Sequence, residues 1–166
     1  MPDGSVYVLR QASADTGGEF VEMEFVLPPG CVPPPPHIHR QQVEEYEVLE
    51  GEFDLIVDGR WQTLGRGGVA SVPVGALHTF RNRSGRVVRV RNWHRPALRF
   101  EQFIERTCAT LEGAGIVRKR DPRVALYLSM IILDFDFDDT LAPGLRRERV
   151  PMQALALIGR LLPGPD

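Results

Sequence analysis

The sequence predicts a mainly β protein, an antiparallel β-barrel or jelly roll followed by a C-terminal α-helical extension. Up to about residue 95, short stretches of alternating apolar and polar residues are separated by glycine, proline and aspartate turn signals. After Pro96, apolar residues recur at helical spacing instead. Short strands at such regular spacing are typical of a closed antiparallel barrel or jelly roll.

Each strand is predicted from its alternation and from the turn residues that end it. In 19–27 every second residue from Val21 is apolar, so these side chains share one face: Val21, Met23, Phe25 and Leu27. Asp58-Gly59 is a strong signal for a two-residue hairpin turn. The expected strands are Ser5–Leu9, Glu19–Leu27, Glu44–Glu50, Glu52–Val57, Arg60–Leu64, Val69–Val72, Leu77–Arg81 and Val87–Trp93.

The last two strands are expected to form a hairpin around 82–85. The length of its loop decides which side chains of the last strand point into the barrel. A two-residue loop would turn Arg89 inward, whereas a longer loop or a bulge would turn Val88 and Val90 inward. We favour the second arrangement because it buries the apolar side chains. It also turns Asn92 and His94 inward, although His94 could instead be an exposed residue beside Pro96.

Residues 98–166 are predicted to form a helical extension on a barrel of residues 1–97. The expected helices are Leu98–Leu111, a second from Asp121-Pro122 through Leu133, and Val150–Leu162. Asp121 suits a helix N-cap and Pro122 a first helical position. The extension could cover the barrel, form a dimer face or close over a pocket.

Four side chains have the composition of a metal site. His37 and His39 are two positions apart, so on an extended chain they point the same way. Glu44 and His78 would complete a set of three nitrogens and one oxygen, which suits a divalent transition metal such as Fe, Mn, Ni, Cu or Zn. An HxH pair alone could equally be two surface histidines.

The spacing around these residues resembles both signature motifs of the cupin family. Four residues separate His39 from Glu44, and six separate Glu44 from Gly51, as in the first motif. The gap between Gly30 and His37 is one residue longer than usual, which a loop tolerates. The second motif is matched at every position, by Gly67, Pro73, Gly75, His78 and Asn82.

The resemblance implies a cupin barrel with one metal ion held by His37, His39, Glu44 and His78. It does not specify the reaction, because the family includes enzymes of several classes as well as binding proteins. We expect dioxygenase-type chemistry on a small, partly apolar oxygen-containing molecule, with Tyr46 as the catalytic side chain beside the metal. The alternatives are a non-catalytic cupin that binds a metal or a small molecule, and a metal-dependent cyclase or isomerase.

The composition is that of an ordinary soluble domain. The 166 residues carry a net charge of −2, which indicates neither nucleic acid nor an anionic membrane as a partner. The sequence has neither a signal-peptide pattern nor an apolar run as long as a membrane span. Its two cysteines, Cys31 and Cys108, fit a reducing cytoplasm. We expect a cytoplasmic homodimer that binds a small-molecule ligand.

The segment 131–141 resembles the DxDxT nucleophile motif of haloacid-dehalogenase-like phosphatases. That chemistry needs a Rossmann-like domain with a lysine downstream, and the chain's one lysine, Lys119, lies upstream. We interpret the motif as a coincidence.

Overall fold

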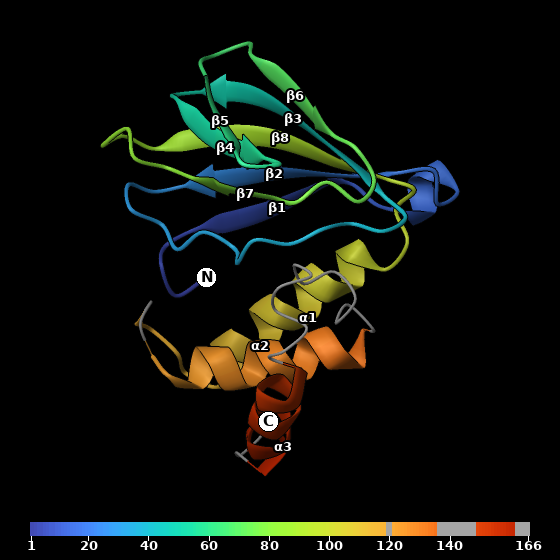
Figure 1. Ribbon diagram of the computed structural model, residues 1–166, viewed down its shortest axis with the longest axis vertical. Coiled ribbons are helices and arrows are strands. Elements are labelled where there is room, and N and C mark those ends of the chain that lie inside the picture. Colours follow the sequence, from blue (N-terminus) through green and yellow to red (C-terminus); the bar gives the residue numbers. More distant parts are fainter. Residues whose placement is uncertain (119–120, 136–148, 162–166) are drawn as a thin grey trace.

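The computed structural model describes residues 1–118, 121–135 and 149–161 of the chain, and Figure 1 shows two sheets above a group of helices. The larger sheet has the strand order β1-β2-β8-β3-β6, and the smaller has the order β5-β4-β7. All the strand pairs are antiparallel. The strands are β1 (Val6–Gln11), β2 (Val21–Leu27), β3 (Val43–Glu50), β4 (Phe53–Val57), β5 (Arg60–Leu64), β6 (Val69–Val72), β7 (His78–Arg81) and β8 (Val88–Arg95).

The prediction of a mainly β jelly-roll fold with a helical extension is confirmed. One short 3₁₀ helix, η1 (Ala14–Thr16), joins β1 to β2. The extension consists of α1 (Phe100–Gly113), α2 (Arg123–Asp134) and α3 (Arg149–Leu161). Asp121 accepts a hydrogen bond from the Arg123 backbone N–H at 2.9 Å, but α2 begins at Arg123, so Pro122 and not the predicted Asp121 occupies the N-cap.

The core lies between the two sheets and follows the predicted alternation. Val21, Met23, Phe25 and Leu27 are at most 3% exposed, and Phe80 of β7 belongs to the same cluster. Burying a side chain of this size contributes about 1.5–3 kcal/mol. The apolar phase of β8 is also confirmed, since all of its inward side chains are at most 1% exposed: Val88, Val90, Asn92 and His94.

The hairpin predicted from the last two strands is wrong. β7 pairs with β4 in the smaller sheet, whereas β8 lies between β2 and β3 in the larger one. The connection therefore crosses from one sheet to the other. Asn82 fixes it by donating hydrogen bonds to the carbonyls of Leu27 at 2.8 Å and Arg86 at 2.7 Å.

The strands on either side of Gly51 also belong to different sheets, β3 to the larger and β4 to the smaller. Gly51 has a φ of 82°, and a Cβ there would lie 2.9 Å from the Val87 carbonyl oxygen. Only glycine therefore fits this crossing without strain. By contrast, Asp58 and Gly59 form the predicted turn between β4 and β5, both with positive φ.

The outer face of the larger sheet carries cross-strand ion pairs. Arg10 and Arg89 both pair with Glu24, which lies between them on β2. Arg91 pairs with Glu22 on one side and with Glu47 on the other. These charges occupy the positions that alternate with the buried residues, so polar and apolar faces are sharply separated.

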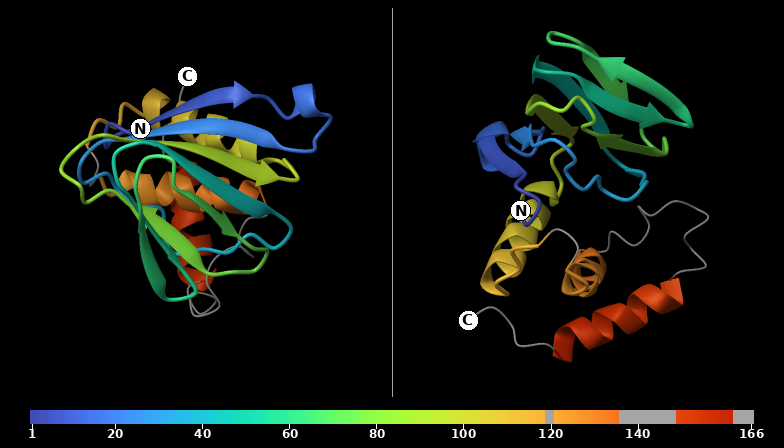
Figure 2. Two further views of the ribbon diagram at one scale, coloured as in Figure 1. Left: turned by 90° about the horizontal axis from the view of Figure 1, so that it is seen from above. Right: turned by 90° about the vertical axis from the view of Figure 1, so that its left-hand side faces the viewer.

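The helices lie at one end of the barrel, with α3 farthest from the strands (Figures 1 and 2). Phe100 belongs to the barrel core, and Phe103 and Ile104 pack against it. A second, smaller cluster of Leu111, Ile116 and Tyr127 joins α1 to α2. Within the described residues, no helix is both long and apolar enough to cross a membrane.

Candidate metal centre

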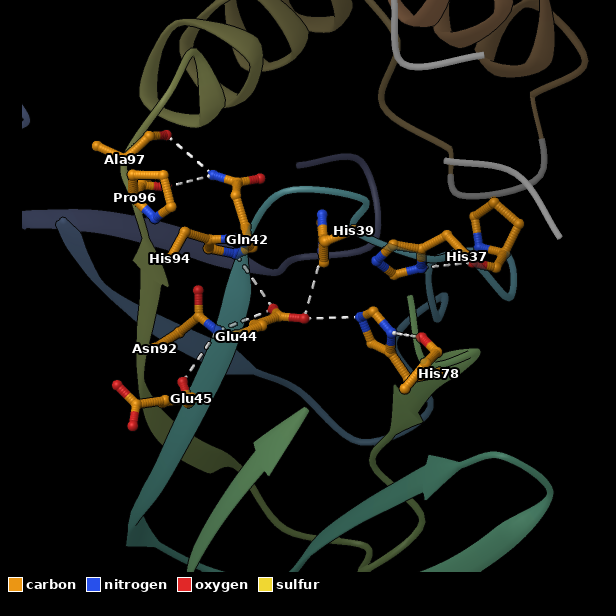
Figure 3. Close-up of polar contacts among 12 residues, drawn as sticks. His37, His39, Gln42, Glu44, Glu45, His78, Asn92, His94, Pro96 and Ala97 are labelled. Carbon is orange, nitrogen blue, oxygen red and sulfur yellow. Dashed lines mark hydrogen bonds and ion pairs between the residues drawn. The ribbon is translucent and has the colours of Figure 1, made fainter. Parts of the chain in front are cut away.

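Backbone contacts bring His37 and His78 together although they are far apart in sequence. The His37 N–H donates to the His78 carbonyl at 3.0 Å, and the His78 N–H donates to the His37 carbonyl at 2.9 Å. Thr79 supports this bridge by donating its hydroxyl to the Pro34 carbonyl at 2.7 Å. The proline run before His37 thus lies against β7, and both imidazoles reach the same end of the barrel (Figure 3).

His39 and Glu44 reach the same place from the other side. The Gly75 N–H donates to the His39 carbonyl at 2.8 Å, which ties the first motif to the turn of the second. Glu44 stands near the start of β3, with its side chain directed into the barrel and only 3% exposed. The four predicted ligands, His37, His39, Glu44 and His78, each offer one atom, and these atoms all lie within 4.8 Å of one another.

The donor atoms fit a metal ion better than they fit one another. His39 Nε2, Glu44 Oε2 and His78 Nε2 are buried and make no hydrogen bond to any described residue. Glu44 Oε2 lies 2.7 Å from His78 Nε2 and 3.4 Å from His39 Nε2, so the atoms are close but poorly aligned. Buried polar atoms without partners are costly, and an ion between them would satisfy all three.

Outer hydrogen bonds orient two of the imidazoles. His37 Nδ1 lies 2.9 Å from the Pro35 carbonyl, and His78 Nδ1 lies 3.0 Å from the Ala76 carbonyl. A carbonyl can only accept, so each Nδ1 carries the proton in the neutral ring. Each Nε2 then presents its lone pair to the site, as metal-binding histidines commonly do.

The pKa values of the two bridged histidines shift in opposite directions. Burial, together with the neighbouring His78 and His39, lowers the pKa of His37 to about 3. Burial also opposes charge on His78, but its contact with the Glu44 carboxylate outweighs this and raises its pKa above the usual value. Burial alone would raise the pKa of Glu44, yet the surrounding histidines hold it well below its usual range. In the metal-free protein, Glu44 is therefore ionised, and its negative charge favours the protonated form of His78.

Tyr46 lies two residues after Glu44, on the same face of β3. It is 1% exposed, and its hydroxyl has no hydrogen-bond partner among the described residues. Burial, and then the negative charge of Glu44, raise its pKa well above the usual value, so the phenol stays protonated. Tyr46 thus lies beside the proposed ligands, and its catalytic role remains a prediction.

Two further polar side chains contact Glu44, and the sequence indicated only their direction. Asn92 Nδ2 donates to Glu44 Oε1 at 2.9 Å, and His94 Nε2 lies 3.2 Å from the same oxygen. The inward phase of β8 was the signal that could have identified them. The stacking of Phe100 on His94, with ring centroids 3.4 Å apart, had no signal in the sequence.

Of the segment 131–141 that resembles the DxDxT motif, residues 136–141 lie outside the described residues. Asp134 is the last residue of α2 and pairs with Arg160 of α3 at 2.6 Å.

A separate open hollow of about 470 Å³ is lined by Glu52, Asp54, Thr63, Arg83 and Ser84. It lies away from the histidines, and Thr63, Arg81 and Arg83 already bind Asp54.

Comparisons with known proteins define the class. Residues 23–94 match the family described as Cupin domain. The crystal structure of TT1209 from Thermus thermophilus is similar, with 25% identity, a TM-score of 0.52, and coverage of 58% of this chain and 88% of that one. The barrel is therefore a cupin domain, and through it the chain belongs to the cupin superfamily.

Two more distant structures share the fold. A predicted oxalate decarboxylase from Thermotoga maritima is 18% identical, with a TM-score of 0.53 over 55% of this chain and 80% of that one. The cupin domain of Schizosaccharomyces pombe Cnp3 is 16% identical, with a TM-score of 0.50 over 61% and 71%. No curated protein matches the chain. These likenesses establish the architecture, and the chemistry has to be argued from the site.

Proposed function

We propose that this protein is a metal-dependent cupin that acts on a small, partly apolar oxygen-containing molecule by dioxygenase-type chemistry. The observation that supports it is the convergence of three imidazoles and one carboxylate, of which His39, Glu44 and His78 have buried donor atoms without hydrogen-bond partners among the described residues. This donor set suits a divalent Fe, Mn, Ni, Cu or Zn ion. Bound there, such an ion would polarise an oxygen ligand or orient it beside dioxygen.

The protein residues would supply the surroundings of that ion. His37, His39, Glu44 and His78 would hold it, and the Nδ1 hydrogen bonds would keep two of the imidazoles in place. Phe100, whose ring centroid lies 6.3 Å from that of His39, presents an apolar wall on one side. An apolar wall excludes competing water and suits an enol, a phenol or a diketone better than a free sugar.

Tyr46 would act as a hydrogen-bond donor to the ligand. Its phenol is protonated, buried and unpaired with any described residue, which is the state that such a donor requires. We expect Tyr46→Phe to reduce turnover about 10- to 100-fold, the size typical of residues surrounding a metal's own ligands, with a smaller change in metal content. Steady-state kinetics with metal analysis of the same preparation will check this. Equal loss of both would refute a role in the chemistry.

The reaction type can be tested directly. Enols, phenols and diketones are screened against the Fe, Mn and Ni forms, following oxygen uptake and ligand absorbance. The proposal predicts oxygen uptake that depends on both metal and substrate. Binding of charged sugars or nucleotides, with none of the oxygen ligands bound, would show that the apolar site has been misread.

Two other functions have support in specific features. The low exposure of His39, Glu44 and His78, 8% or less, favours a cupin that binds metal or ligand without turnover. The protonated Tyr46 also suits a cyclase or isomerase, which needs a proton donor but no oxygen. Turnover under anaerobic conditions would indicate the cyclase or isomerase, and tight binding without turnover would indicate the binding protein.

A further inference from the structure

The pairing of β3 with β8 places two polar residues of each strand side by side. Glu44 is opposite His94, and Tyr46 is opposite Asn92. Directly opposite residues in an antiparallel pair have their side chains in contact. The carboxylate of Glu44 therefore has neighbours on β8 as well as the histidines of the two cupin motifs (Figure 3).

The two oxygens of Glu44 face different partners. Oε2 faces the cluster of ligands, 2.7 Å from His78 Nε2. Oε1 faces β8, where it accepts a hydrogen bond from Asn92 Nδ2 at 2.9 Å and lies 3.2 Å from His94 Nε2. Asn92 also donates to the Glu45 carbonyl at 3.3 Å, which ties its amide to the backbone of β3. One oxygen is thus held by the protein while the other is directed to the metal position.

His94 is itself held by the start of the helical extension. Its ring is 1% exposed and stacks on Phe100, with ring planes 22° apart. Gln42 fixes the connection between β8 and α1 by donating to the carbonyls of Pro96 at 2.9 Å and Ala97 at 3.0 Å. Phe100, the first residue of α1, is therefore placed by contacts from the barrel and in turn limits the tilt of the His94 ring.

We propose that Asn92 and His94 are positioning residues that hold Glu44 as a one-oxygen metal ligand, and that Phe100 extends this support into the C-terminal helix. The inference rests on the proposed metal site. Without the Asn92 hydrogen bond and the His94 contact at Oε1, the carboxylate can rotate or present both oxygens to the ion. The helical extension then influences the geometry of the metal centre without supplying a ligand.

Metal affinity and metal spectroscopy test this in the full-length protein. The variants are His94→Leu, His94→Gln, Asn92→Leu and Phe100→Leu, loaded with Cu(II) or Co(II). Affinity is measured by competition with a chelator, and the ligand field by electron paramagnetic resonance and visible absorption. Ile104→Ala is the matched control, because Ile104 lies on the same helix as Phe100 and packs against the same core.

The expected results separate positioning from general stability. His94→Leu and Asn92→Leu weaken metal binding about 10- to 100-fold and change the spectra, as losses of outer partners do. Phe100→Leu gives a smaller change of the same kind. His94→Gln recovers much of the affinity, because its amide can donate to Glu44 from the same position. Ile104→Ala lowers the unfolding temperature but leaves affinity and spectra unchanged.

Other outcomes would overturn the inference in distinct ways. Folded His94→Leu and Asn92→Leu proteins with wild-type affinity and spectra would show that Glu44 needs no support. Loss of one coupled nitrogen in the Cu(II) spectrum of His94→Leu would show that His94 is itself a ligand. A wild-type protein that binds no metal would instead refute the proposed function.

Discussion

The barrel and the helical extension bury their apolar residues to different degrees. In the barrel, the inward residues of β2 and β8 are at most 3% exposed, and charged residues fill the outer positions. In the extension, α3 leaves Leu157, Ile158 and Leu161 exposed by 63%, 49% and 80%. The contact between the two regions is concentrated at α1, through Phe100 and Ile104. The barrel thus buries its own apolar residues, with α1 covering part of the core. The far helix α3 has an exposed apolar stripe.

Removing the extension is expected to have the largest effect. Deleting residues 98–166 would uncover His94 and the core beside Phe100, so we expect an aggregating or unstable barrel. A chain ending after Gly115 keeps α1, and we expect it to retain the barrel fold. Soluble yield, size-exclusion chromatography and circular dichroism will compare the two. A soluble, folded chain of residues 1–97 would show that the barrel does not depend on α1.

Removing a metal ligand should affect the barrel's site and leave the extension unchanged. We expect His78→Ala to remain folded and to lose more than the roughly 100-fold in metal affinity typical of outer partners, because a donor to the ion itself is gone. The double His37→Ala/His78→Ala variant should bind no metal at the site. Metal content by mass spectrometry gives the answer, with thermal unfolding as the check on folding. Wild-type metal content in the double variant would refute the ligand assignment.

The apolar stripe on α3 leads to a prediction about assembly. Ala154, Leu157, Ile158 and Leu161 recur at the spacing of one helix face, and all four are exposed. We propose that a second copy covers this stripe, since one face can pair with itself about a two-fold axis. Leu157→Glu should convert a dimer to a monomer without changing metal affinity, as measured by light scattering and chelator competition. An unchanged oligomeric state would remove α3 from the interface.

The smallest expected effect is the dependence of metal binding on pH. Because the pKa of His78 is raised in the metal-free protein, binding must displace its proton, so affinity increases as pH rises through that pKa. His37 is already neutral, with a pKa of about 3, and releases nothing. We expect up to about one proton released per ion, measured by calorimetry in buffers of different ionisation enthalpy. Proton release that is absent at every pH from 5.5 to 8 would contradict this.

The same shifts affect folding of the metal-free protein. His37 has an ordinary pKa of 6.5, lowered to about 3 in the fold. Below pH 6.5, His37 therefore binds a proton in the unfolded chain but not in the folded one. The free energy of unfolding consequently decreases as pH falls from about 6.5 towards 3. The raised pKa of His78 acts in the opposite sense, and its contribution is lost as pH rises through the folded value.

The sequence predicted which way side chains point better than it predicted what they touch. Alternation identified Val88, Val90, Asn92 and His94 as inward, because the face of a strand depends only on a period of two. Motif spacing likewise identified the four candidate ligands that the fold brings together. Strand partners were harder: the hairpin expected around 82–85 was wrong because nothing local shows that the chain changes sheets there.

Contacts between the barrel and the extension could not be predicted at all. Phe100 fitted an amphipathic helix, and helical spacing indicates that such a residue is buried without indicating its neighbour. Its stacking on His94 depends on the route of the chain through 95–99 and on the two hydrogen bonds from Gln42. Each of these is a tertiary feature, so only the three-dimensional arrangement shows that the helix reaches the site.

The four candidate ligands come from both halves of the β-sandwich: Glu44 from the larger sheet, His78 from the smaller, and His37 bridged to His78. An ion held by all of them would join the two sheets at that end of the barrel and oppose their separation. Metal supply would then govern how readily this end of the barrel opens, and with it the lifetime of the chain against proteases. A cell short of the metal would lose the protein itself as well as its activity.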